Sequence, residues 1–448
     1  TLCDKIGDRI GFARFASLLE KSVPAGGSLH RMRLYKLLAR HHLALGEYTE
    51  SNHFALQAMD IASETSLYGD LADCLDLSTE NYSRLGEPRL ALLKLRDSIR
   101  IRMRKGLKSE VGVAIRALAG LYWLEGNYAK ALRCAEHDVK LTSLSSRKHS
   151  LVMAYNSLAV LRMESGQLLE AKNTYARALA LAARTSDAGA MSIVQSNLGC
   201  CEHYSGDITR AVYHCLQSLT LQAGAGTPAG HPQSLLELAD LALARGLFMA
   251  AFDHIGRAHQ TARDSGEICN QVEAEIRAGW TLHHLGAFRD SQDTFSNIHA
   301  NLARSASKVQ QVAYLMGMAR NNTALGRLDS AAEFLDQIAR MIPKQNVICN
   351  LTHQISLGHH LAASNKVAAA RRAFLGASTL ARRLGYRRFR FEASLALAQS
   401  FLSTGEHEEA GPLLRRLSGM HRRLKYRLYE PWLELALSDF AGLNGSPV

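Results

Sequence analysis

The residue types that could bind a metal or carry redox chemistry in this 448-residue chain are its nineteen histidines and eight cysteines. Their spacing is unfavourable, because the sequence has no C-x-x-C pair and no H-E-x-x-H segment. Signatures of nucleotide and acyl chemistry are missing too: there is no G-x-x-x-x-G-K-[ST] loop, no G-x-G-x-x-G after a strand and no G-x-S-x-G turn. We therefore expect no catalytic residue, no metal and no cofactor, and the sequence predicts a protein that is not an enzyme.

The vicinal pair Cys200 and Cys201 is the one redox candidate among the cysteines. Neighbouring residues of a helix point to different faces, so this pair is not expected to react as a unit. We expect the cysteines to be small, buried, apolar side chains in a reducing cytosol. No run of about eighteen apolar residues occurs, and the first residues lack a signal-peptide pattern. We expect a cytoplasmic protein without a membrane span. Because the chain begins at Thr1 and not at methionine, we also expect a fragment of a longer protein or a processed product.

Glycines recur at a spacing of forty residues, in a chain that is 47% hydrophobic, has only eight prolines and favours helix. Glycine and asparagine are the residues that most readily adopt a left-handed backbone, so each of these positions predicts a turn that ends a helix. After one deleted residue, the register continues at an asparagine. The column consists of Gly46, Gly86, Gly126, Gly166, Gly206, Gly246, Gly286, Gly326, Asn365, Gly405 and Gly445.

Two columns of small residues flank each predicted turn. In the first ten repeats, the residue five positions after the glycine or asparagine is always Ala or Ser, and the residue seven positions before it is Ala, Gly or Thr. Small side chains on facing helices allow a close approach of the two axes. In most repeats, large residues stand two and nine positions after the glycine, where they would fill the space beside the turn and the core. Each unit is therefore predicted to be helix, tight turn, helix.

The pattern L-[AG]-x6-G-x-[YFLI]-x2-A-x3-[large] resembles the tetratricopeptide repeat, in a forty-residue variant, over about residues 30 to 442. The resemblance implies an all-α fold, a right-handed α-α superhelix of about ten helix-turn-helix repeats with a C-terminal capping helix that starts near Pro431. We expect residues 1–29 to form an N-terminal helix or cap. The segment AGAGTPAGHP would separate repeats 1–5, residues 30–222, from repeats 6–10 and the capping helix, residues 233–442.

The resemblance also implies that residues 13, 10, 9, 6, 3 and 2 before each glycine face the concave wall. A cationic stripe there in the first repeat, Arg33, Lys36 and Arg40, is followed by an acidic stripe in the second, Asp73, Asp76 and Glu80. The two stripes bind a partner or pair with each other. The predicted partner-binding groove continues through Arg116, Trp123, Asn156, Met163, Asn197, His203 and Tyr204.

Asn156 and Asn197 occupy positions at which peptide-binding members of the family hold a ligand's backbone. An amide can donate to a carbonyl and accept from an N–H at once, although an asparagine on a solvated helix face is the alternative. In the second half, the same offsets give Trp280 and Arg320 with a set of apolar residues, which predicts a more apolar wall: Leu236, Ile276, Met316, Ile355 and Leu395. The histidine pairs His41-His42, His283-His284 and His359-His360 lie at different offsets, so we expect them not to share a face.

The formal net charge of +12 is concentrated near the C-terminus, where residues 371–427 contain thirteen Lys and Arg against four acidic residues. The predicted basic patch consists of Arg387, Arg388, Arg390, Arg422, Arg423 and Lys425. Its aromatic neighbours Tyr386, Phe389 and Tyr426 are of the kind that stacks on bases. An acidic protein partner, a nucleic acid and a plainly solvated surface are the three alternatives.

The sequence predicts a non-enzymatic scaffold that binds a peptide or partner domain in a concave groove. The alternative is the regulatory or sensor arm of a larger signalling protein, in which the solenoid switches an attached or bound ATPase, kinase or caspase-like domain. A nucleic-acid-binding solenoid is the weaker third alternative.

Overall fold

The computed structural model describes residues 28–44, 47–85, 87–106, 108–144, 148–224, 231–264, 267–305 and 307–444. These residues form α-helices joined by short turns, and no strand occurs among them. The first ten helices are α3 (Ser28–Ala44), α4 (Tyr48–Glu64), α5 (Tyr68–Arg84), α6 (Pro88–Arg104), α7 (Lys108–Leu124), α8 (Tyr128–Ser143), α9 (Lys148–Glu164), α10 (Leu168–Arg184), α11 (Ala188–Ser205) and α12 (Ile208–Gly224). The second half contains α13 (Pro232–Ala244), α14 (Phe248–Asp264), α15 (Ile268–Leu285), α16 (Phe288–Ser305), α17 (Lys308–Ala324), α18 (Leu328–Met341), α19 (Val347–Ala363), α20 (Val367–Leu384), α21 (Arg387–Leu402), α22 (His407–Leu424), the 3-10 turn η1 (Arg427–Tyr429) and α23 (Glu430–Asn444).

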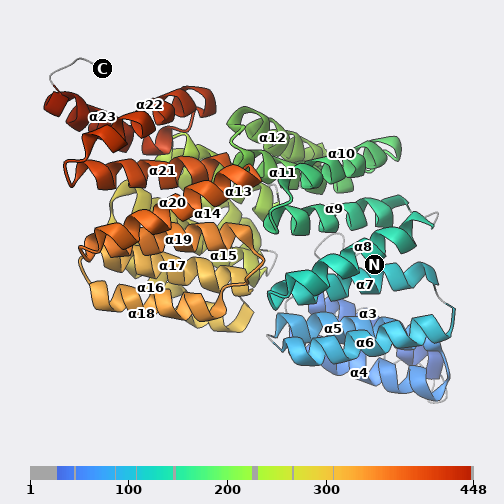
Figure 1. Cartoon of the computed structure of the whole chain (residues 1–448). Helices are drawn as coiled ribbons and strands as arrows, with labels where there is room; N and C mark the ends of the chain where they lie inside the picture. Colours follow the sequence, from blue (N-terminus) through green and yellow to red (C-terminus); the bar gives the residue numbers. More distant parts are fainter. Residues whose placement is uncertain are drawn as a thin grey trace.

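Consecutive helices pair into ten hairpins, from α3 with α4 to α21 with α22, and α23 packs on the last of them (Figure 1). Each hairpin also packs against the first helix of the next one. The all-α repeat fold and its C-terminal capping helix are thereby confirmed. The N-terminal helix predicted for residues 1–29 lies outside the described residues, apart from its last two positions.

The turn inside each described hairpin has the left-handed residue that the sequence predicts. Gly126, Gly166, Gly206 and the later glycines of the column have φ between 71° and 89°, and Asn365 has φ 58°. Gly46, Gly86 and Gly445 lie outside the described residues. The turns between hairpins also use left-handed residues, among them Ser66, Ser186 and Lys425. Sequence reasoning missed this second set because most of its members are not glycine.

The small columns bring the two helices of each hairpin together. Ser51 and Ser291 show how, because each hydroxyl donates to the carbonyl of the small residue at the partner position, Ala39 and Gly279, at 2.7 Å. All members of the column five residues after the turn are fully buried: Ser51, Ala91, Ala131, Ala171, Ala211, Ala251, Ser291, Ala331, Ala370 and Ala410. A larger side chain in this column would push the helices apart.

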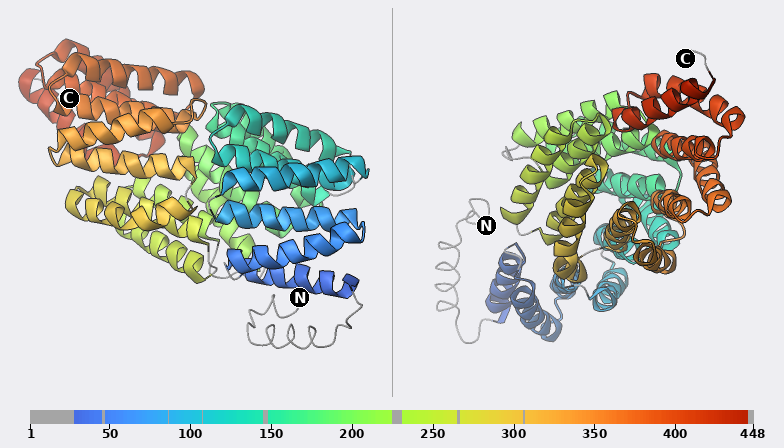
Figure 2. Two further views of the ribbon diagram at one scale, coloured as in Figure 1. Left: turned by 90° about the horizontal axis from the view of Figure 1, so that it is seen from below. Right: turned by 90° about the vertical axis from the view of Figure 1, so that its left-hand side faces the viewer.

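The later repeats fold back against the earlier ones, so that one turn of the superhelix lies on the next (Figure 2). Asn346, at the start of α19, donates to the Tyr128 hydroxyl at 2.6 Å across 218 residues of sequence. The Tyr386 hydroxyl donates to the Met163 carbonyl in the same way. The turn at Gly206 lies against Leu424 of α22. These contacts place the turns inside the hairpins of repeats 3–5 beside repeats 8–10.

The predicted boundary near residue 225 falls in part on residues 225–230, which lie outside the described residues. On either side of that segment, α12 and α13 share polar contacts: Ser218 and Gln222 both contact the Ser234 hydroxyl at 3.1 Å. Ser234 in turn donates to Ser196 of α11 at 3.2 Å. The division into residues 30–222 and 233–442 stays a prediction. In the described parts of the chain, no helix is both long enough and apolar enough to cross a membrane.

Candidate functional site

The first helices of repeats 2–8 enclose a cavity of about 800 Å³, which we call the inner channel. Helix α6 contributes Leu95 and helix α19 contributes Ile348 to its lining. Its polar and aromatic lining includes Asp76, Thr79, Glu80, Trp123, Glu164, Asn197, Tyr204, Glu237, Glu273, Arg277 and Gln310. A cavity of this volume lies at the upper end of the range of ligand pockets.

Four of the predicted groove residues line the inner channel: Trp123, Met163, Asn197 and Tyr204. Asn197 donates from Nδ2 to the Asn156 Oδ1 atom at 2.9 Å. Asn156 is only 7% exposed and does not line the channel, so its role is to hold the Asn197 amide through this hydrogen bond. The pair leaves Asn197 as the amide that faces the channel.

Arg116 is not a groove anchor, which corrects the prediction. Its Nε atom lies 2.7 Å from the Asp138 Oδ2 atom, and its terminal nitrogen donates to the Ser150 carbonyl at 2.7 Å. The Asp138 side chain is fully buried, and burial raises the pKa of its carboxyl group. Arg116 therefore compensates a buried charge and holds α7, α8 and α9 together.

The cationic stripe of the first repeat is used in part for internal pairing, as one of the two alternatives predicts. Lys36 lies 2.7 Å from Asp70 and 3.0 Å from Asp73. Arg33 and Arg40 are exposed on α3, and none of the three lines the inner channel. In the acidic stripe, Asp76 pairs with the buried Arg102 at 2.9 Å. Lys36 thus ties α3 to α5.

His203 and Tyr204 lie at the contact between superhelical turns, which the sequence did not predict. The His203 ring lies 6.5 Å from the ring of Tyr426, and the Tyr204 ring stacks on Phe389 at 5.9 Å. Burial lowers the pKa of His203 well below its ordinary value, so this imidazole is neutral. His203 is 2% exposed and is closed to a partner, whereas Tyr204 also reaches the inner channel.

An excess of carboxylates marks the floor of the inner channel. Arg277 forms ion pairs with three of them: Glu237 at 3.7 Å, Glu273 at 3.1 Å, and Asp240. Burial raises the pKa of Glu237 to about 7, which Arg277 opposes and Asp240 reinforces. Asp240 does not line the channel, and the buried Arg388 also acts on it. In the lining itself, the Arg277 guanidinium faces the two carboxyl groups of Glu237 and Glu273, so a further positive charge would stabilise this floor.

A second buried carboxyl group, Glu164, lies where the channel meets the contact between turns. Its Oε2 atom accepts from Trp123 Nε1 at 2.8 Å, from the Tyr128 hydroxyl and from Asn346 at 3.1 Å. Burial raises the pKa of Glu164, while the hydrogen bonds from Tyr128 and Trp123 act in the opposite direction. Trp123 is therefore fixed in the channel wall by a contact that also joins the two superhelical turns.

Sequence reasoning missed the channel floor although its signal was present. Glu164, Glu237, Glu273 and Arg277 stand 2, 9, 13 and 9 residues before their repeat glycines, all at the predicted wall offsets. The same offsets in the second half gave a wrong prediction of an apolar wall. The apolar residues there are at most 3% exposed and belong to the core, although Leu395 also reaches a second pocket: Leu236, Ile276, Met316, Ile355 and Leu395.

The basic patch is smaller than predicted. Arg387, Arg422, Arg423 and Lys425 are exposed, and Arg390 is half-buried. Arg388 turns inward, and its guanidinium carbon lies 5.5 Å from the centre of the Phe389 ring. Burial acts to lower the pKa of Arg388, but the neighbouring tyrosines and the negative charge of Asp240 outweigh it, so the pKa is raised. The aromatic residues near the patch are buried, so they offer no stacking surface to a nucleic acid: Tyr386, Phe389 and Tyr426.

The histidines were also predicted wrongly in part. His283, His284 and His359 share one pocket in the second half, instead of pointing to separate faces. Burial raises the pKa of the Cys200 and Cys201 thiols, as expected for unreactive cysteines. Among the described residues, no three His, Cys, Asp or Glu side chains are grouped to hold a metal ion.

The architecture is that of a tetratricopeptide-type α-solenoid, as the ten described hairpins and their turns show. No family model matches the sequence, and a comparison with curated proteins finds no relative.

Among solved structures, three examples have a course of helices similar to that of this chain. Yeast Tom70 is 13% identical over 92% of this chain and 96% of its own, with a TM-score of 0.38. A Rap protein complexed with Competence and Sporulation Factor is 14% identical over 89% and 98%, with a TM-score of 0.44. BtubC from P. vanneervenii is 19% identical over 50% and 92%, with a TM-score of 0.39. All three TM-scores are below 0.5, so no partner is carried over to this chain.

Proposed function

We propose that this protein is a non-enzymatic interaction module that binds an extended, positively charged peptide in its inner channel. The observation that carries this proposal is the floor of the channel, where Arg277 forms ion pairs with Glu237 and Glu273, which both line the cavity. A lysine, an arginine or a peptide amino terminus would restore the charge balance there. Charge-assisted hydrogen bonds to a carboxylate contribute about 1.5–3 kcal/mol each.

The size and lining of the channel favour a peptide over a small cation. The cavity of about 800 Å³ extends along helices α5 to α17, farther than one ammonium group can fill. Asn197 offers an amide to a ligand's backbone, and Trp123 and Tyr204 offer aromatic faces to its side chains. An acidic partner, which the sequence predicted from the basic C-terminal surface, is disfavoured at this site because the floor already has excess negative charge.

The test uses three fluorescent peptides of equal length that contain lysine, glutamate or only neutral residues, measured by fluorescence anisotropy. We expect the lysine peptide to bind most tightly. Glu273→Gln and Glu237→Gln should each weaken it roughly tenfold, because each removes about 1.5 kcal/mol of charge-assisted bonding.

The matched control is Glu434→Gln, which makes the same change at an exposed position on α23. This variant should bind like the wild type. The proposal is overturned if the glutamate peptide binds as tightly as the lysine peptide, or if the two channel variants keep wild-type affinity.

A further inference from the structure

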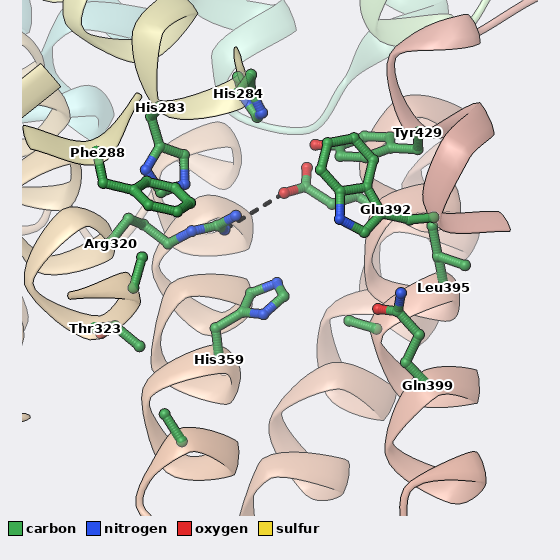
Figure 3. A pocket seen from close by; sticks show the side chains of 14 residues that line it. His283, His284, Phe288, Arg320, Thr323, His359, Glu392, Leu395, Gln399 and Tyr429 are labelled. Carbon is green, nitrogen blue, oxygen red and sulfur yellow. Dashed lines mark ion pairs between the residues drawn. The ribbon is translucent and has the colours of Figure 1, made fainter. Parts of the chain in front are cut away.

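A second pocket, of about 400 Å³, lies in the later superhelical turn, between α15, α17, α19, α21 and the η1–α23 segment (Figure 3). We call it the histidine pocket, after His283, His284 and His359 in its lining. It shares no lining residue with the inner channel. Its volume suits a small molecule and is too small for a folded partner.

The only full charges in the lining of the histidine pocket at neutral pH belong to Arg320 and Glu392. Their nearest atoms, Nη1 and Oε1, lie 3.5 Å apart, beyond an ordinary hydrogen bond. The Arg320 and Glu392 side chains are 12% and 13% exposed. Among the described residues, neither side chain has a hydrogen-bond partner. Figure 3 shows the two groups approaching each other from opposite walls. A guanidinium and a carboxylate are thus both available to a ligand.

The three histidines add no charge. Burial lowers the pKa of His283 to about 3 and the pKa values of His284 and His359 well below the ordinary value, and Arg320 lowers all three further. The lining therefore holds one positive and one negative group and has no net charge of its own; Arg388, which also lowers the pKa of His284, lies outside the lining. A ligand that carries a single charge would leave one of the two groups facing a like charge.

The proton position on His283 follows from a chain of hydrogen bonds. The Gly279 carbonyl can only accept, so the Ser291 hydroxyl donates to it, and Asn321 Nδ2 donates to Ser291 at 2.7 Å. The Oδ1 atom of Asn321 then accepts from His283 Nδ1 at 2.6 Å. The proton of the neutral ring therefore lies on Nδ1, and Nε2 is left as an acceptor for an N–H group in the pocket.

Aromatic rings complete the pocket. Tyr429 and Trp432 lie with their ring centres 6.1 Å apart, and Trp432 is 40% exposed. Phe288 covers the side of His283, with ring centres 5.3 Å apart. The faces of such rings attract an ammonium group, and their area accommodates an apolar side chain.

We propose that the histidine pocket binds a free α-amino acid, with the ligand's carboxylate on Arg320 and its ammonium group on Glu392. A zwitterion matches the pocket because it is neutral as a whole and presents opposite charges on neighbouring atoms. His283 Nε2 accepts a further ammonium N–H, and the aromatic rings contact the ligand's side chain. The site is independent of peptide binding in the inner channel.

The first experiment needs no mutation. A panel of L-amino acids is titrated into the protein by isothermal titration calorimetry, and the best binder is compared with its deaminated acid and its decarboxylated amine. We expect each analogue to bind at least roughly tenfold more weakly, since each loses one charge-assisted contact. The absence of binding by every amino acid, or an analogue that binds as tightly as its parent, would overturn the proposal.

The second experiment assigns the two contacts. Glu392→Gln should remove the preference for the amino acid over its deaminated acid, and Arg320→Gln should remove the preference over the decarboxylated amine. Arg340→Gln, at an exposed position on α18, is the matched control and should keep both preferences. If either pocket variant retains the full preference of the wild type, the assignment is wrong.

Discussion

Replacing Arg116 with alanine is expected to destabilise the protein by about 3–5 kcal/mol, the usual loss when one partner of a buried ion pair is removed. The substitution would leave the Asp138 carboxylate without its counter-ion, in a position with no exposed side-chain surface. It would also remove the hydrogen bond to the Ser150 carbonyl that joins α7 to α9. Urea unfolding followed by circular dichroism measures the loss.

Two further variants distinguish the loss of stability caused by an unpaired Asp138 charge from the effect of removing any arginine. Arg133→Ala removes a cation from the exposed face of α8 and should change stability by less than about 0.5 kcal/mol. Adding Asp138→Asn to Arg116→Ala should recover part of the loss, because an amide costs less to bury than a carboxylate. If Arg116→Ala is as stable as Arg133→Ala, the ion pair does not have this structural role.

A second large effect is expected from Gly317→Ala in α17. A Cβ atom built at Gly317 lies 2.2 Å from the Phe295 ring, which is fully buried. Overpacking of this kind costs about 1–3 kcal/mol or more, and the gain of about 1 kcal/mol from alanine's helix propensity does not offset it. We expect a net loss of about 2 kcal/mol in urea unfolding.

The matched control for Gly317→Ala is Gly256→Ala in α14, where a Cβ atom meets nothing within 4 Å. That variant should gain stability, by about 0.5–1 kcal/mol. Replacing the Phe295 ring by the smaller side chain of leucine should reduce the loss of stability caused by Gly317→Ala. A double-mutant cycle detects this reduction as a coupling energy. Equal effects of the two glycine substitutions would contradict the packing described between α16 and α17.

The hairpins could be predicted from the sequence because each depends on contacts within one forty-residue unit. A left-handed residue at the turn and small residues on both sides of it are local requirements, so they recur at a fixed period. The contact between superhelical turns could not be predicted in this way. Asn346 and Tyr128 are 218 residues apart, and their meeting depends on small rotations that accumulate over several repeats.

A further column of the repeat contains a signal for part of the site. Asp138 stands twelve residues after Gly126, in a column whose other members are small or apolar. All members of that column are at most 1% exposed: Ala58, Ser98, Asp138, Ala178, Ser218, Ala258, Ile298, Ile338, Ala377 and Leu417. A lone carboxylate in a buried column requires a counter-ion, so Arg116 could have been assigned to it. Arg320 and Glu392 both stand at predicted wall offsets, 6 and 13 residues before their glycines, but their pairing could not be predicted because the two residues belong to different repeats.

Peptide binding in the inner channel should change the protonation of the Glu237 carboxyl group. Burial raises the pKa of this carboxyl group to about 7, so it is largely protonated at about pH 6. A bound lysine side chain favours the ionised form and lowers that pKa. Binding should therefore release a proton, and it should tighten as the pH rises from about 6 to about 8, through the pKa of the free protein.

The most direct test is calorimetry of the lysine peptide at about pH 6, in two buffers of different ionisation enthalpy. The difference in binding heat gives the number of protons released. We predict release by the wild type and by Glu434→Gln, and no release by Glu237→Gln, which has no proton to lose at this position. Equal proton release by the wild type and Glu237→Gln, or proton uptake by the wild type, would contradict the assignment of the inner channel as the binding site.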